Sequence, residues 1–292
     1  MNTTTIQNES PQNNYQQEVI INLAPTGMVP TRQMSPQVPL TVNEIVEQAC
    51  RCIEIGANIV HLHARDEADK PTYKKAVYEN IIAGIREKHS DVVLGVSLSG
   101  REFTTFAERS DVLELSGDLK PDLASLTLSS MNFASGPSVN APDMIVQLAQ
   151  KMLEVGIKPE LEVFDLGMIN MVEYLADKNL INPPYYLNLI LGNLATAQVN
   201  PSHIAALVTS IPSESVWTVG GIGRAQRSAN ALGILHGNGA RVGLEDNLWM
   251  DNERTLPATN EMLTSGVVKF AEWMGKTTAT PKRVRQMLNL GS

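Results

Sequence analysis

Two histidines separated by one leucine, His61 and His63, form the most informative chemical pattern in the chain. They end an apolar run from Asn58 to His63 that is typical of a β-strand, in which side chains at i and i+2 point to the same face. Two imidazoles on one face can converge on a single cation, because imidazole is a common metal ligand. The pattern favours a metal site over two histidines that only hydrogen-bond in a core or at a surface.

A pair of carboxylates, Glu245 and Asp246, follows a second apolar run near the other end of the sequence. The carboxylate of Glu245 would give the two histidines a third ligand. Two histidines and one carboxylate leave coordination positions open for a substrate, as in catalytic zinc sites. In the competing interpretation, the acidic pair forms a solvated rim or carries charge at a helix N-terminus.

Two more acidic residues, Glu160 and Glu162, stand at i and i+2 between apolar neighbours in a run that ends at Phe164. A protein interior does not hold such charges unpaired, because taking an ion out of water is very unfavourable. We expect Arg241 to be their partner.

Small hydroxyl residues and a glycine stand at the ends of two further apolar runs. They are Ser97, Ser99 and Gly100 after one run, and Ser125, Thr127 and Ser129 in and after the other. Their hydroxyl and backbone N–H groups could hold an anionic oxygen. Serine and threonine are equally common in loops that bind nothing, so the sequence leaves both interpretations open.

The elements that must position these residues are eight short apolar runs, which alternate with longer segments of helical period. The runs are Val19 to Ala24, Asn58 to His63, Val92 to Ser97, Leu123 to Leu128, Glu160 to Phe164, Tyr186 to Leu191, Val216 to Gly220 and Ala240 to Glu245. No GxGxxG fingerprint follows the first run, which argues against an open doubly wound sheet. The predicted fold is an α/β protein with a closed TIM (β/α)8 barrel, in which the eighth strand adjoins the first.

Composition narrows the class of protein. The chain has 292 residues and a formal net charge of -8, which argues against nucleic acid as a partner. No apolar run approaches the roughly 20 residues that span a bilayer. Cys50 and Cys52 fall in one expected helix, where their side chains diverge, so we expect no disulfide and a reducing, cytoplasmic setting. Residues 1–18 are rich in Asn, Gln and Thr and predict a disordered polar tail, followed by a single barrel domain over residues 19–292.

Eight short motifs are spread along the chain from about Val19 to Leu290. They are APTG (24–27), VPLT (38–41), GANIVHLHARD (56–66), SLTLSSMNF (125–133), KPELEVFD (158–165), GGIGR (220–224), RVGLEDN (241–247) and TPKRVRQMLNL (280–290). Taken together and in this order, they resemble the β-keto acid cleavage enzymes. That family consists of zinc-dependent TIM barrels that transfer an acetyl unit between a β-keto acid and acetyl-CoA.

The resemblance implies roles for the residues singled out above. The implied zinc ligands are His61, His63 and Glu245, and the implied catalytic residues are Asp246 as general base with Arg241 and Glu162 setting its position and charge. The implied contacts to the substrate carboxylate are Ser97 and Ser125, with Thr127 and Gly100 close by. The resemblance also implies a homotetramer.

The implied reaction agrees with elementary chemistry. Zinc is a Lewis acid that polarises the keto carbonyl, and a carboxylate can then remove a proton to expose a carbon nucleophile. Attack on the thioester of acetyl-CoA, followed by retro-Claisen cleavage, gives acetoacetate and a new acyl-CoA.

The chain departs from the family pattern at several positions, among them Val29, the segment Ser97 to Gly100, and Gly237-Asn238-Gly239 in place of a glycine pair, and none of these departures removes an implied zinc ligand. Val29 stands where some members carry an acidic residue that pairs with a substrate amino group, so an amino-bearing keto acid is not expected. The segment Ser97 to Gly100 reads SLSG where many relatives read STGG.

Two other functions stay open on the sequence. One is a zinc-dependent TIM-barrel hydrolase or aldolase that does not use CoA, which the same three ligands would serve. The other is a non-catalytic binding barrel with a structural acidic cluster. Dependence of turnover on acetyl-CoA separates the first from the main interpretation, and stoichiometric metal binding separates the second.

Overall fold

A closed barrel of parallel strands forms the centre of the computed structural model, which describes residues 17–291. Its strands are β1 (Glu18–Leu23), β2 (Ile59–Leu62), β5 (Val93–Val96), β6 (Leu123–Thr127), β9 (Lys158–Val163), β10 (Tyr185–Leu191), β11 (Ser215–Gly221) and β12 (Gly239–Val242). Each pairs with its neighbours in this order, and β1 pairs with both β2 and β12, which closes the ring. The predicted TIM barrel is confirmed.

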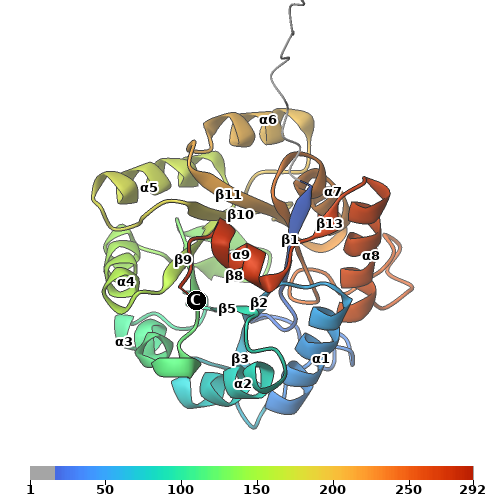
Figure 1. The fold of residues 1–292 in the computed structure, drawn as a ribbon, viewed down its shortest axis with the longest axis horizontal. Coiled ribbons are helices and arrows are strands. Elements are labelled where there is room, and N and C mark those ends of the chain that lie inside the picture. Colours follow the sequence, from blue (N-terminus) through green and yellow to red (C-terminus); the bar gives the residue numbers. More distant parts are fainter. Residues whose placement is uncertain (1–16, 292) are drawn as a thin grey trace, which may run out of the picture.

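Helices surround the barrel, as Figure 1 shows. They are α1 (Val42–Ile55), α2 (Lys75–Lys88), α3 (Phe106–Ser110), α4 (Pro142–Val155), α5 (Leu166–Asp177), α6 (Pro201–Ser210), α7 (Gln226–His236) and α8 (Asn260–Trp273), with short 3-10 turns η1 (Asp111–Glu114), η2 (Gly117–Leu119) and η3 (Gly223–Ala225). Local chemistry sets their ends. Thr41 and Glu44 form a capping box at the start of α1, and Gly56 ends it. In the described residues no helix has the length and apolarity that crossing a membrane requires.

The interior of the barrel changes character from one end to the other. Near the starts of the strands, inward-facing apolar residues form a layer that contains Ile20, Ile59, Val93, Leu123 and Tyr186. Because side chains alternate along a strand, the inward positions two residues further on include Asn22, His61, Ser125 and Asn188, and Glu160 lies beside Ser125 on the neighbouring strand. The polar groups are therefore gathered toward the carboxyl ends of the strands, where TIM barrels build active sites.

A last helix, α9 (Pro281–Met287), covers the apolar end of the barrel. Its Val284, together with Leu288 just beyond it, is fully buried against the apolar layer. The short strand β13 (Thr277–Thr278) leads into this helix and pairs with the beginning of β1. The motif TPKRVRQMLNL thus forms a floor that the alternating pattern of strands and helices does not reveal.

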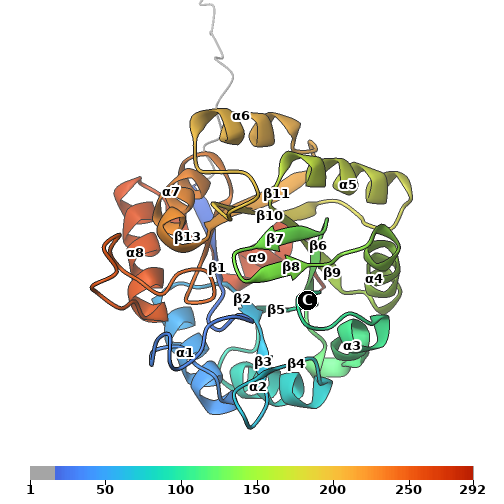
Figure 2. The same ribbon diagram turned by 180° about the vertical axis from the view of Figure 1, so that it is seen from behind.

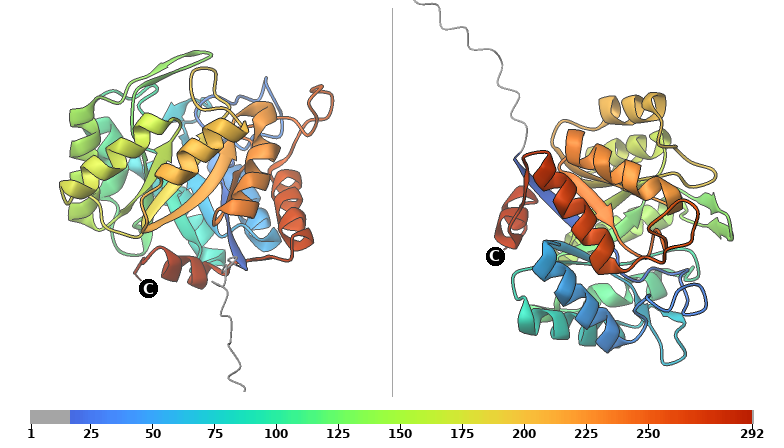
Figure 3. Two further views of the ribbon diagram at one scale, coloured as in Figure 1. Left: turned by 90° about the horizontal axis from the view of Figure 1, so that it is seen from above. Right: turned by 90° about the vertical axis from the view of Figure 1, so that its right-hand side faces the viewer.

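Two β-hairpins lie at the opposite end of the barrel. One pairs β3 (Ala64–Arg65) with β4 (Pro71–Thr72), and the other pairs β7 (Met131–Phe133) with β8 (Gly136–Ser138). Figure 2 shows the β7–β8 hairpin in front of the barrel centre, and the left view of Figure 3 shows it at the end away from α9. The sequence predicted neither hairpin, because each strand has only two or three residues.

Several expected boundaries shift. The strands end within a few residues of the predicted positions, but β12 ends at Val242, so Glu245 and Asp246 lie on the loop after it and not on the strand. The predicted polar tail lies outside the described residues except for its last two, and Glu18 already belongs to β1. Cys50 and Cys52 are buried free thiols, as expected.

Candidate active site

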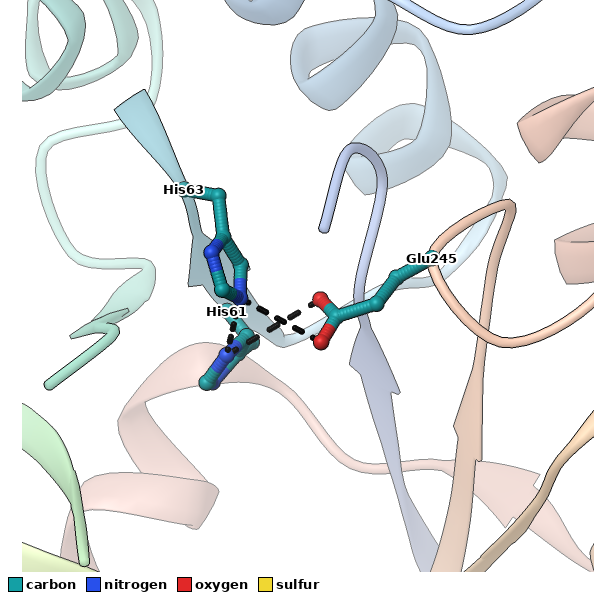
Figure 4. Close-up of side chains that lie close together, drawn as sticks. All are labelled: His61, His63 and Glu245. Carbon is teal, nitrogen blue, oxygen red and sulfur yellow. Dashed lines mark hydrogen bonds and ion pairs between the residues drawn. The ribbon is translucent and has the colours of Figure 1, made fainter. Parts of the chain in front are cut away.

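The side chains of His61, His63 and Glu245 converge at the carboxyl end of the barrel, as Figure 4 shows. His61 lies in β2, His63 immediately follows it, and Glu245 reaches them from the loop after β12. His63 Nε2 is 3.2 Å from both His61 Nε2 and Glu245 Oε1, and His61 Nε2 is 3.9 Å from Glu245 Oε2. The predicted ligand set is therefore assembled in space.

These three residues fit a tetrahedral zinc ion. Zn–N and Zn–O bonds of about 2.0–2.1 Å place the ligand atoms of a tetrahedron roughly 3.3 Å apart, close to the two separations of 3.2 Å from His63 Nε2. Glu245 Oε2 is buried with no hydrogen-bond partner in the described residues, although a carboxylate oxygen is a strong acceptor. A cation between the three side chains would satisfy that oxygen.

A glycine makes room for the acidic ligand. Gly27, in the APTG motif after β1, has a φ of 71°, and a side chain there would place its Cβ 2.5 Å from Glu245 Cγ. Any other residue would displace Glu245 from the histidines. The close approach explains the glycine in both conformational and steric terms.

Glu160 anchors the first histidine from below. Its Oε2 lies 2.7 Å from His61 Nδ1, while its Oε1 accepts hydrogen bonds from the amides of Asn22 (2.7 Å) and Asn188 (2.9 Å). All of these groups are buried. A carboxylate on Nδ1 holds that proton and leaves Nε2 free to face the cation. Burial lowers the pKa of His61, but Glu160 and Glu245 outweigh it and raise the pKa to about 9.

This contact corrects one expectation. Arg241 was the expected partner of both Glu160 and Glu162, but the hydrogen-bonding partners of Glu160 are His61, Asn22 and Asn188. Only Glu162 approaches Arg241, at 3.6 Å. The pattern of acidic residues at i and i+2 cannot distinguish the two, because it contains no information on depth within the barrel.

Arg241 is the electrostatic centre of the site. It is almost fully buried, and its guanidinium lies 2.7 Å from Glu245, 2.8 Å from Asp246 and 3.6 Å from Glu162. Gly220 of β11 leaves the space that its side chain occupies, since a Cβ there would stand 3.1 Å from Arg241 Cβ. One cation therefore holds all three carboxylates in place.

The three carboxylates have different proton affinities. Burial raises the pKa of Asp246 above its ordinary value, and adjacent Glu245 raises it further, against the lowering effect of Arg241. Burial likewise raises the pKa of Glu162, which Arg241 offsets only in part. For Glu245 the charges of Arg241, His63 and His61 outweigh burial and hold the pKa well below its usual range. Glu245 thus suits a metal ligand, and Asp246 suits a group that accepts a proton.

A cavity of about 610 Å³ opens above these groups. His63, Glu245, Asp246, Arg241 and Glu162 line its base. Its walls include Ser97, Ser99, Arg101, Thr127, Phe133, Asn193 and Trp249, and Val29 and Met34 also line it. Its size is that of a pocket for a small molecule.

The predicted substrate-contacting residues divide into two groups. Ser97 and Thr127 line the cavity, and Thr127 Oγ1 donates a 2.6 Å hydrogen bond to Glu162. Ser125 is not among the lining residues, and its hydroxyl accepts from the backbone N–H of Leu98 at 3.1 Å. Gly100 packs against Val139 and Arg109, also away from the lining. Neither Ser125 nor Gly100 lines the cavity, and their role in substrate contact stays a prediction.

The model of the beta-keto acid cleavage enzyme family matches residues 18–290. The chain belongs to this family. A 3-keto-5-aminohexanoate cleavage enzyme of Acetoanaerobium sticklandii is 36% identical over 276 residues, which cover 94% of this chain and 99% of the relative. A 3-oxoadipate:acetyl-CoA acetyltransferase of Cupriavidus necator is 33% identical over 279 residues, covering 94% and 96%.

A solved structure shares the fold at low sequence identity. ObcA in a binary complex with oxaloacetate aligns with a TM-score of 0.77 and 22% identity, over 88% of this chain and 68% of the other. At this identity the likeness concerns the barrel alone.

Removal of a ligand should abolish metal retention. We expect His61→Ala and Glu245→Gln each to lose bound zinc, because a three-ligand site cannot hold the ion tightly with two. Elemental analysis of the purified variants measures this, and Asp246→Asn is the control that should keep its metal. Unchanged zinc content in both ligand variants would refute the site.

The anchor beneath His61 should matter for affinity. We expect Glu160→Gln to weaken zinc binding by about 10- to 100-fold, because the neutral amide stabilises the ring less well than a carboxylate. Competition with a chromogenic chelator measures the affinity, and circular dichroism checks the fold. Glu162→Gln is the matched control, since Glu162 contacts Arg241 and not the histidines. Equal zinc affinities for Glu160→Gln and the unsubstituted protein would contradict the anchoring role.

Proposed function

We propose that this chain transfers an acetyl unit from acetyl-CoA to a fragment of a small β-keto acid, with zinc held by His61, His63 and Glu245. The products are acetoacetate and a new acyl-CoA. The observation that carries this proposal is the placement of Asp246, a carboxylate with a raised pKa, directly beside the three-ligand cluster in a cavity of substrate size. Membership of the family and the acetyl-CoA named for the relative from Cupriavidus necator support the choice of substrates.

The reaction balances with one proton acceptor. When bound, zinc supplies Lewis acidity that makes the methylene between the keto carbonyl and the carboxylate more acidic. Asp246 accepts a proton from that carbon, which then forms a bond to the acetyl carbon while the thioester C–S bond breaks. The released thiolate attacks the original keto carbon. The bond between this keto carbon and the former methylene carbon then breaks, which gives the new acyl-CoA. The proton returns from Asp246 to the former methylene carbon, which gives acetoacetate.

The supporting residues have electrostatic roles. Arg241 contacts Asp246 through Nε at 2.8 Å and keeps its carboxylate oriented in both protonation states. Glu162 contacts the same guanidinium and accepts a hydrogen bond from Thr127. These two contacts hold the Glu162 carboxylate in place. A preorganised set of charges of this kind lowers the reorganisation needed as a negative charge develops on the substrate.

The alternative of a zinc-dependent hydrolase or aldolase without CoA uses the same three ligands. No feature of the cavity favours it, and the family assignment supports the CoA-dependent reaction. A screen of small β-keto acids with and without acetyl-CoA, scored by acetoacetate release, separates the two functions.

We also propose a homotetramer, on the family resemblance, and a reducing, cytoplasmic setting, on the buried free thiols of Cys50 and Cys52.

Loss of the base should separate chemistry from metal binding. We expect Asp246→Asn to keep its zinc and to lose kcat by about 10²- to 10⁴-fold, since an amide cannot accept the proton. Acetoacetate release under saturating substrates measures kcat. Glu253→Gln, an exposed carboxyl on the same loop, is the matched control and should turn over normally. Normal turnover of Asp246→Asn would show that another group is the base.

The pH profile should reflect the raised pKa of Asp246. Because the base must be ionised, kcat/KM should fall as the pH decreases through that pKa, with a midpoint above the value of about 4 typical of aspartate. Zinc content is measured at each pH so that metal loss is not mistaken for titration. A metal-replete profile that stays flat down to pH 4 would rule out a base with a raised pKa.

A further inference from the structure

Arg101 places a guanidinium on the cavity wall that the proposed reaction does not use. It follows Gly100 in the loop after β5, is half-buried, and lines the same cavity as His63 and Asp246. Its guanidinium carbon lies 3.8 Å from the ring centroid of Phe133, which belongs to β7 in the hairpin above the barrel. The ring in turn packs edge-on against Phe164. Stacking of this kind holds a cation in one place.

No acidic group of the described residues neutralises Arg101 within ion-pair distance. No carboxylate among residues 17–291 lies within 4.0 Å of it, although Glu245, Glu162 and Asp246 are near enough to affect its pKa. Burial lowers that pKa from its ordinary value, but a guanidinium stays charged in proteins. The cavity therefore contains a half-buried cation whose side-chain donors have no hydrogen-bond acceptor among the described residues.

The charges of the cavity do not balance around Arg101. Three carboxylates line the cavity, and all three already contact Arg241. With the proposed divalent cation bound, that ion and Arg241 together offset the three negative charges. Arg101 is then surplus, as are the exposed Arg224 and Arg254 at the rim, for which the described part of the chain offers no ion pair either.

We propose that Arg101 binds a second carboxylate at the far end of the keto acid, so that the preferred substrate is a dicarboxylic β-keto acid. This inference rests on the proposed function. Arg101 makes no ion pair with a carboxylate of the described residues, and we assign it to the distal carboxylate because the three metal ligands and Asp246 already account for the reacting end of the substrate.

Substrates with other distal groups fit the cavity less well. A distal ammonium would meet Arg101 and the apolar Val29 and find no lining carboxylate that Arg241 does not already contact. A distal methyl would bury against a guanidinium and deprive it of water without replacing the lost hydrogen bonds. A carboxylate matches the planar fork of donors and restores them.

A pair of acids that differ only in the distal group tests the proposal. They are 3-oxoadipate, a dicarboxylate, and 3-oxohexanoate, which has a methyl in place of the second carboxylate. We expect the unsubstituted enzyme to favour 3-oxoadipate in kcat/KM by about 10- to 100-fold, the range of a charge-assisted bidentate pair. Arg101→Ala should lose that preference and change kcat/KM for 3-oxohexanoate by less than about threefold.

Two variants frame the result. Arg101→Lys should recover part of the preference, because it restores the charge without the fork of donors. Arg227→Ala, which removes an exposed arginine outside the cavity lining, should behave like the unsubstituted enzyme. Equal losses on both acids would mean that Arg101 contacts the reacting carboxylate, and a change confined to the KM of acetyl-CoA would mean that it binds a phosphate of CoA. Either result, or no change at all, overturns the proposal.

A binding measurement keeps this proposal separate from the proposed function. Calorimetric titration of the protein with adipate and with hexanoate needs no turnover, and we expect adipate to bind more tightly by an amount that Arg101→Ala removes. If no β-keto acid yields acetoacetate, the proposed function fails while Arg101-dependent adipate binding still supports a carboxylate subsite. If adipate binds no better than hexanoate, the subsite is absent even in an active enzyme.

Discussion

The active centre depends on one buried guanidinium. Arg241 lies inside a barrel where an isolated charge would be prohibitively unfavourable, and it is tolerated because three carboxylates surround it. The dependence is mutual, since Glu162, Glu245 and Asp246 could not remain together without a cation among them. The arrangement gives the three carboxylates different pKa values. The one closest to the imidazoles stays ionised, while burial raises the proton affinities of the other two.

Much of this centre follows from the sequence, because strand geometry is periodic. His61 and His63 share a face by the alternation of a strand, and closure of the barrel brings the loop after β12 next to β2 by way of β1. Those two rules suffice to predict that Glu245 meets the histidines. Gly27 and Gly220 give a weaker indication of the site. The reason for each glycine is clear only from the structure, in which Glu245 and Arg241 occupy the space beside them.

The features of the site that the sequence did not predict depend on how deep a side chain lies in the barrel and on the conformation of the loops. Glu160 and Glu162 look equivalent as letters, yet one lies beneath His61 and the other beside Arg241, one pleat repeat higher. Arg101 gives no periodic signal, because its position is fixed by a ring on a hairpin some thirty residues later in the chain. The same limit applies to Ser125, whose hydroxyl is bonded to a neighbouring backbone N–H and not directed into the cavity.

The apolar floor beneath the barrel, where Val284 and Leu288 pack against Ile20 and Ile59, closes that end of the interior, and the cavity opens at the other end. Two reactants of unequal size must share that opening. In the proposed reaction, acetyl-CoA and the keto acid would both have to reach the three metal ligands from that side of the barrel.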